Sequence, residues 1–110
     1  MTSVLLEFSM FPTSGDCRDG ASVSQYVSRI VDMIDRSGVP YRLTPMGTIV
    51  ETQSVAEALA IVQQAYDVLG EDCERVYSAL KLDIRKGKSG RLVGKIDSVK
   101  KALGRDDIVA

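Results

Sequence analysis

The sequence contains the same structural unit twice, a helix cap followed by an amphipathic helix, and this repeat constrains the fold more than any other feature. Two segments open with the pattern Ser-x-x-Gln/Glu, at Ser22–Gln25 and at Ser54–Glu57. In such a capping box the serine hydroxyl accepts a hydrogen bond from a helical amide while the later side chain reaches back toward the cap. Apolar residues at helical spacing follow each box and predict two amphipathic helices: Val23, Tyr26, Val27, Ile30, Val31 and Ile34, then Val55, Leu59, Val62, Tyr66 and Leu69.

Segments typical of β-strands flank both predicted helices. Their composition and alternation predict strands over about 4–11, 41–44, 48–52 and 75–85. With helices on one face and right-handed crossovers, this order predicts an α+β fold, a ferredoxin-like βαββαβ sandwich with antiparallel sheet order 4-1-3-2. A third, C-terminal helix is predicted by four apolar residues at helical spacing before a glycine stop: Leu92, Ile96, Val99, Leu103 and Gly104.

Length and composition limit the class of protein. The 110 residues predict a single domain over 1–110, with a core of about 4–85 and a basic segment with its helix over about 86–104. The net charge of −1 and an apolar fraction of 45% disfavour disorder and give no overall field for nucleic acid or membrane. No segment approaches the roughly 20 apolar residues of a membrane span. The start of the chain lacks the pattern of a signal peptide, and we expect a cytoplasmic protein.

The absence of histidine removes the most common catalytic and metal-binding chemistry. Without an imidazole there is no ordinary general base near neutral pH, no Ser-His or Cys-His nucleophile and no histidine metal ligand. The sequence also has no P-loop and no G-x-G-x-x-G segment. Cys17 and Cys73 are expected to be free thiols rather than a disulfide. We therefore predict a protein that is not an enzyme and has no metal site or cofactor.

Alternation along the first predicted strand separates its two faces. One face is apolar and suited to pack under the helices: Val4, Leu6, Phe8 and Met10. The opposite, open face carries apolar residues from three strands: Leu5, Phe11, Ile49 and Tyr77. Because a small domain seldom leaves such a patch in water, the sequence predicts a homo-oligomer that buries this face.

Three connecting segments are expected to meet at one edge of the sheet, namely 12–20, 45–48 and 70–74. The hairpin turn is predicted over 45–48, with Gly47 free to adopt a positive φ. The antiparallel third strand is expected to bring Glu51 roughly across from Glu7 on the open face. Two carboxylates there would attract a positive ligand, whereas a cross-strand pair of Glu7 with Lys81 is the structural alternative.

Other candidate residues also have two interpretations. Ser9, Thr13, Thr44 and Thr48 have hydroxyls that suit a ligand, yet β-propensity and turn chemistry explain them as well. Phe11, Tyr41 and Met46 suit the wall of a pocket or a subunit interface. The cations of the C-terminal segment suit RNA or phosphate, although they also fit the solvated face of a helix.

Four segments of the chain resemble the YkoF-like thiamine-binding protein family. They are residues 6–13, the Ser-Val-Ser-Gln-Tyr-Val start of the first helix, the Pro-Met-Gly-Thr hairpin with Glu51, and Asp83–Arg85 followed by Lys95 and Ile96. The resemblance implies small ferredoxin-like domains that bind thiamine or a related pyrimidine without known catalysis. It also implies a homodimer that assembles into a homotetramer.

The resemblance also implies a ligand site at the hairpin. Thiamine has a permanent cation, an aminopyrimidine that donates and accepts hydrogen bonds, and a hydroxyethyl arm. The residues expected to meet these groups are Glu7 and Glu51 for the charge, Ser9, Thr44 and Thr48 for polar contacts, Phe11 and Met46 for the walls, and Gly47 in the turn. One alternative is a structural or protein-interaction module that does not bind thiamine. A second is an anion- or RNA-binding domain that uses the basic C-terminal segment.

Overall fold

The computed structural model describes residues 1–13, 24–70 and 73–108. Its elements are β1 (Thr2–Pro12), α1 (Ser24–Ser37), β2 (Tyr41–Thr44), β3 (Gly47–Thr52), α2 (Val55–Gly70), β4 (Val76–Lys86) and α3 (Arg91–Leu103). The four strands form one antiparallel sheet in the order β2-β3-β1-β4. This arrangement confirms the predicted ferredoxin-like α+β sandwich, its strand order and its C-terminal helix.

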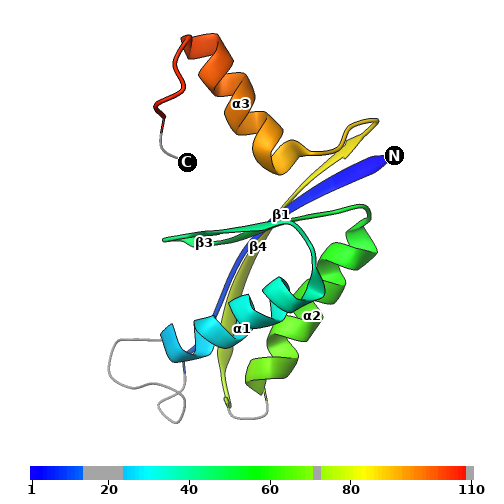
Figure 1. The fold of residues 1–110 in the computed structure, drawn as a ribbon. Helices are drawn as coiled ribbons and strands as arrows, with labels where there is room; N and C mark the ends of the chain where they lie inside the picture. Colours follow the sequence, from blue (N-terminus) through cyan, green and yellow to red (C-terminus); the bar gives the residue numbers. More distant parts are fainter. Residues whose placement is uncertain (14–23, 71–72, 109–110) are drawn as a thin grey trace.

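The core lies between the sheet and the two helices that cover one of its faces. The side chains of Val4, Leu6 and Phe8 on β1 are at most 2% exposed, as the alternation predicts. Removing such a side chain from water contributes roughly 1.5–3 kcal/mol. Helices α1 and α2 lie on this face and α3 lies on the opposite one (Figure 1). The helices contribute six residues to the buried cluster, namely Ile30, Ile34, Ala58, Ile61, Ala65 and Leu69.

Strand β1 is paired unequally on its two sides. Its partner β4 runs beside it for the full length of the strand, from Thr2 opposite Lys86 to Pro12 opposite Val76. Strand β3 is shorter, and its pairing with β1 ends where Phe8 lies opposite Thr48. Among the described residues, the last four residues of β1 therefore have no strand pairing on that side.

The start of α2 shows the predicted serine cap. The amide of Glu57 donates to Ser54 Oγ at 3.1 Å, and the Glu57 carboxylate accepts from the amide of Gln53 at 3.1 Å. The carboxylate thus reaches one residue farther back than in the usual capping box. The corresponding box at the first helix falls on Ser22, which lies outside the described residues.

The turn of the hairpin differs from its prediction. Strand pairing continues to Thr44 opposite Gly47, so the turn consists of Pro45 and Met46 alone. Gly47 does not have a positive φ. Glycine is required for a different reason, because a Cβ at this position would lie 2.8 Å from the carbonyl oxygen of Phe8. The Thr44 hydroxyl closes the turn instead: it donates to the Gly47 carbonyl at 2.8 Å and accepts from the amides of Met46 and Gly47.

Two further expectations concern the cysteines and the membrane. Cys73 is buried and disulfide-bonded, so the expectation of a free thiol is wrong for this residue. Cys17 lies outside the described residues. In the part of the chain that the structure describes, no helix has the length and apolar character needed to cross a bilayer.

The Ser54→Ala variant tests the cap of α2. The free energy of unfolding is expected to fall by about 1 kcal/mol, because the Glu57 amide loses its hydrogen-bond acceptor. Urea denaturation measures the change. Ser28→Ala is the matched control, since this exposed hydroxyl donates to the Gln25 carbonyl within its own helix and its loss should cost less than about 0.5 kcal/mol. Equal losses in the two variants would contradict the assigned cap.

Candidate ligand-binding site

A cavity of about 350 Å³ lies where β1 extends past the hairpin. The far end of β1 forms one wall, the β2–β3 hairpin a second and α1 a third. This volume is at the lower end of the range for small-molecule sites, roughly 300–1,000 Å³. Its lining residues are Phe8, Ser9, Met10, Phe11, Val27, Ile30, Leu43, Thr44, Pro45, Met46, Gly47 and Thr48. None of these side chains carries a charge.

The backbone of Met10 offers one donor and one acceptor to this cavity. Backbone hydrogen bonds at both ends of the β1–β4 ladder, from Thr13 to Arg75 and from Gly87 to Met1, join odd-numbered residues. Because the pattern alternates along an antiparallel ladder, the even-numbered residues of β1 direct their N–H and C=O groups toward β3. Strand β3 does not extend to the position opposite Met10. No strand in the described part of the chain pairs with Met10 on that side.

The hydroxyl groups of the cavity come from β1 and the hairpin. Ser9 is half-buried, Thr48 is 5% exposed, and Thr44 uses its hydroxyl to close the turn. The walls are apolar, with Phe11 held by ring contact to Tyr77 at a centroid distance of 5.7 Å. A neutral ring with hydrogen-bonding edges is the kind of molecule that such a lining suits.

An adjoining groove between α1 and β2 carries negative charge. It shares Val27 and Leu43 with the cavity and is lined also by Asp32, Asp35 and Tyr41. The Tyr41 hydroxyl donates to Asp35 Oδ1 at 3.0 Å. This hydrogen bond to the carboxylate, with desolvation and the carboxylate's charge, raises the pKa of Tyr41. A cationic group attached to a ring in the cavity would find these carboxylates within the same continuous surface.

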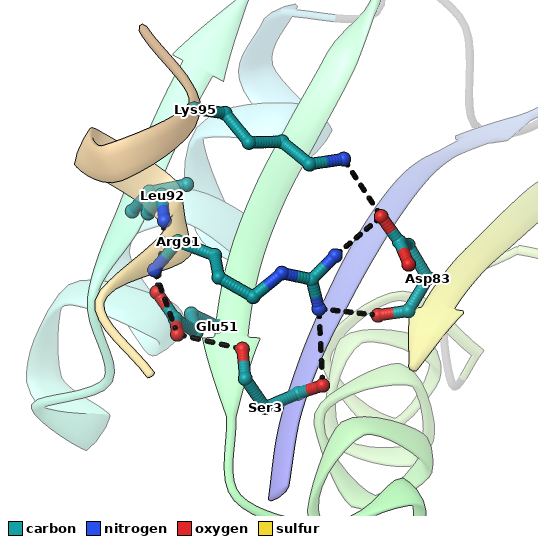
Figure 2. A network of polar contacts seen from close by, with 6 residues as sticks. All are labelled: Ser3, Glu51, Asp83, Arg91, Leu92 and Lys95. Carbon is teal, nitrogen blue, oxygen red and sulfur yellow. Dashed lines mark hydrogen bonds and ion pairs between the residues drawn. The ribbon is translucent and has the colours of Figure 1, made fainter. Parts of the chain in front are cut away.

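Glu51 lies away from the cavity and caps α3 (Figure 2). Its two carboxylate oxygens accept hydrogen bonds from the amides of Arg91 at 3.1 Å and Leu92 at 2.9 Å, and from the Ser3 hydroxyl at 2.7 Å. These amides belong to the first turn of α3, where helical N–H groups lack intrahelical partners. Negative charge at that end is also favoured by the helix dipole. Glu51 therefore fixes α3 to the open face of the sheet.

Arg91 completes the attachment of α3. Its side chain is 2% exposed and lies against β1 and β4, where its Nη1 donates to the carbonyl oxygens of Ser3 and Asp83, each at 3.1 Å. A second guanidinium nitrogen forms an ion pair with the Asp83 carboxylate, which also accepts from Lys95 Nζ at 2.7 Å (Figure 2). The Lys95 hydrogen bond leads the effects that lower the pKa of Asp83.

The pKa of Glu51 reflects two opposing effects. Desolvation is the largest and raises it, because a carboxylate loses hydration inside the network. Hydrogen bonds from Leu92, Ser3, Arg91 and Gly90 together outweigh desolvation and lower the pKa below its ordinary value of 4.5. The ionised form is thus the one that the folded protein favours.

The structure brings six of the eight predicted site residues together around the cavity: Ser9, Phe11, Thr44, Met46, Gly47 and Thr48. It does not bring Glu7 and Glu51 there. Glu7 lies opposite Ile49 and Glu51 opposite Leu5, so the two acids are diagonal neighbours rather than a facing pair. Glu7 also lies opposite Lys81 and forms an ion pair with it at 3.5 Å, which confirms the structural alternative.

Sequence reasoning missed the wall contributed by α1 and β2. Val27 and Ile30 were assigned to the apolar face of the helix, and Leu43 was assigned no role. Helical spacing identifies such residues as core-facing, but it does not show that the core opens at this end. The place where β3 stops relative to β1 supplies that information, and a strand end is poorly defined by sequence.

Comparison with known proteins is consistent with this geometry. The family model described as "Thiamine-binding protein" matches residues 6–100. The chain belongs to the thiamine-binding protein family. A UPF0045 protein of Methanothermobacter thermautotrophicus is 32% identical over 101 residues, which covers 91% of this chain and 99% of that protein. The UPF0045 protein Mb1933 of Mycobacterium bovis is 30% identical over 96% of this chain and 99% of its own length.

Two solved structures share the fold. The hypothetical protein MJ1052 of Methanocaldococcus jannaschii aligns with a TM-score of 0.71 and 31% identity over 94% of this chain and 98% of its own. TM0486 of Thermotoga maritima, provisionally assigned to thiamine biosynthesis or salvage, aligns with a TM-score of 0.70 over 88% of this chain and 98% of its own. At 20% identity, the second similarity establishes the fold alone.

The Glu51→Gln variant tests the capping role through its pH dependence. Because the folded-state pKa lies below 4.5, ionised Glu51 contributes stability that is complete above this value and is lost as the pH falls through the folded-state pKa. At neutral pH the variant is expected to lose about 1 kcal/mol of the free energy of unfolding, since an amide replaces a charged acceptor.

Urea denaturation at neutral pH and at pH values below 4.5 measures this effect. The difference between wild type and Glu51→Gln should shrink at the acidic end. Glu74→Gln is the matched control, because it removes the same charge from an exposed position outside the strands and helices. A constant difference across the pH range would contradict the role of the ionised carboxylate.

Proposed function

We propose that this protein is a non-catalytic binding protein for thiamine or a related aminopyrimidine, and that the ligand lies in the hairpin cavity. The observation that carries the proposal is the backbone edge of Met10, which no strand among the described residues pairs, beside an uncharged, hydroxyl-bearing cavity. The family membership supports the same ligand class. The protein is further proposed to act in the cytoplasm as a homodimer that assembles into a homotetramer.

The aminopyrimidine ring matches the edge of β1. An exocyclic amino group next to a ring nitrogen presents one donor and one acceptor side by side. The C=O and N–H of a single residue in an extended strand offer the complementary pair, as they do when another strand is added to a sheet. Met10 provides this pair, while Ser9 and Thr48 provide hydroxyls beside it.

The positive charge of thiamine requires a carboxylate other than the two first expected, Glu7 and Glu51. Glu51 is occupied by the amides of α3, and Glu7 is paired with Lys81. We propose that the thiazolium ring extends along Val27 and Leu43 toward Asp35 and Tyr41 in the adjoining groove. A carboxylate and an aromatic face are both favourable neighbours for an organic cation.

Calorimetric titration of the ligand-free protein with thiamine tests this function. Saturable binding is expected, and Ser9→Ala should weaken it by about three- to tenfold through loss of one hydrogen bond. Ser98→Ala on α3 is the matched control and should bind like wild type. Absence of heat and of thermal stabilisation at millimolar thiamine would contradict the proposal and favour a protein-interaction module.

Two charge variants separate the alternative carboxylates. Asp35→Asn should weaken thiamine binding, and the loss should shrink at high salt because the groove is open to solvent. Glu51→Gln should leave the affinity within about twofold of wild type, since its carboxylate lies outside the cavity. The opposite pattern, in which the Glu51 variant loses affinity and the Asp35 variant does not, would show that the cation binds at the open face of the sheet.

A further inference from the structure

The groove that adjoins the hairpin cavity is lined by charges of one sign. Its volume is about 560 Å³, and its walls come from α1 and β2. Asp32 and Asp35 are the charged residues in its lining, and both are exposed. In the part of the chain that the structure describes, no lysine or arginine lines either the cavity or the groove. A ligand that extends from the cavity into the groove therefore meets negative charge.

Two arginines of the same elements lie elsewhere. The guanidinium of Arg29 on α1 lies over the ring of Tyr26, with its central carbon 4.9 Å from the ring centroid. Arg42 on β2 lies opposite Ile49, on the open face of the sheet, because side chains alternate along a strand and its two neighbours face the groove. Neither arginine is placed to offset the charge of the groove.

The carboxylate of Asp35 keeps its full charge. Arg36 forms an ion pair at 3.2 Å with the other acid of the groove, Asp32. Asp35 instead accepts a hydrogen bond from the Tyr41 hydroxyl at 3.0 Å. This contact raises the pKa of Tyr41, so the hydroxyl stays protonated at neutral pH. A neutral donor orients the Asp35 carboxylate without cancelling its charge.

The spacing along α1 determines which part of the ligand meets Asp35. Val27 lines both the cavity and the groove, and Asp35 follows eight residues later, about 12 Å along the helix axis. In the proposed orientation the aminopyrimidine lies at Met10 and the thiazolium ring extends along Val27 and Leu43. The hydroxyethyl arm is then the part that reaches toward Asp35. This arm is where the phosphorylated forms of thiamine carry their phosphate.

A phosphate group is poorly matched to this end of the groove. Proteins bind phosphate through arginine, lysine or the amides of a helix N-terminus. At Asp35 a phosphate would instead lie near a carboxylate of the same sign, with no basic side chain among the described lining residues. The hydroxyl of the unesterified arm has no such conflict, because it can donate a hydrogen bond to the carboxylate.

We propose that this groove makes the site selective for unphosphorylated thiamine over its mono- and diphosphate, and that Asp35 is the residue that determines the selectivity. The inference rests on the proposed function, from which it takes the orientation of the ligand. A protein with this preference holds its ligand as the free alcohol, the form that precedes esterification with phosphate.

The opposite end of the groove offers the alternative orientation. Ser24 is the first residue of α1 and lines the groove. A phosphate directed toward that end would approach a helix N-terminus, where negative charge is favoured. The same dipole disfavours the permanent cation of the thiazolium ring, whereas the two carboxylates favour it. The charge of thiamine itself therefore supports the orientation toward Asp35.

Parallel calorimetric titrations with thiamine, its monophosphate and its diphosphate test the selectivity. Wild type is expected to bind thiamine at least about tenfold more tightly than the monophosphate, because repulsion between like charges a few ångströms apart near a protein surface is of this order. The ratio of the two dissociation constants should fall at high salt, since the groove is exposed. Equal or tighter binding of the monophosphate would overturn the proposal.

The Asp35→Asn variant should act in opposite directions on the two ligands. Loss of the carboxylate removes an attraction for thiamine and a repulsion for the monophosphate, so the ratio of dissociation constants should narrow by about threefold or more. A merely distorted site would weaken both ligands alike. Asp97→Asn removes the same charge from an exposed position on α3 and should leave the ratio within about twofold of wild type. An unchanged ratio in Asp35→Asn would contradict the role of this residue.

The same titrations distinguish failure of this inference from failure of the proposed function. Saturable binding of thiamine together with equal binding of its phosphates would overturn the selectivity and leave the binding function standing. Absence of thiamine binding would overturn the function, and the selectivity with it.

Discussion

The unequal pairing of β1 is the constraint on which the rest of the structure depends. One side of this central strand is paired with β4 along its whole length, while the pairing with β3 ends at Thr48. A backbone group away from water needs a partner, so the unpaired end of β1 has to be met by solvent or by a ligand. The hairpin cavity exists because β2 and β3 are short. The same pairing makes β4 the outer strand, and no strand in the described part of the chain pairs with its far side.

The open face of the sheet has a structural role that its two acids did not reveal in the sequence. Glu51 and Arg91 lie far apart in the chain, yet together they attach α3: one accepts from its first amides, and the other enters the sheet surface beneath it. Burying a guanidinium is favourable only when its charge and its donors are met. Asp83 meets the charge, and two backbone carbonyls and the Asp83 carboxylate accept from the terminal guanidinium nitrogens, while the buried Nε has no partner among the described residues. The region that first resembled a cation site is therefore the attachment point of a helix.

Sequence patterns were sufficient for the architecture because several local signals agreed. Alternation along β1, the Ser54 cap and the apolar spacing of α2 each specify one element, and their order leaves few topologies. The β1–β4 register also matched the pairing of Glu7 with Lys81 that the sequence allowed. The hairpin was less predictable, since glycine at position 47 serves a close backbone approach instead of a positive φ. An odd or even position along a strand predicts which face of the sheet a side chain lies on. It does not predict which residues lie next to it.

The site was only partly predictable for the same reason. Residues of the hairpin were predicted to lie together and do line one cavity, because the motif that carries them is contiguous in sequence. The role of Glu51 was not, because its partners are backbone amides of a helix that sequence spacing does not place in three dimensions. Met10 was assigned only to the core face, and its backbone was overlooked. Side-chain patterns carry no information about main-chain groups left unpaired by a neighbouring strand.

Amide chemical-shift mapping during thiamine titration tests the central claim most directly. The account predicts that the largest perturbations fall on the Met10 amide and on its neighbours Ser9 and Phe11, with smaller ones on the hairpin. The amides of Arg91 and Leu92, which bond to Glu51, should shift little. Perturbations concentrated on those two amides, with Met10 unaffected, would contradict the account and move the ligand to the open face.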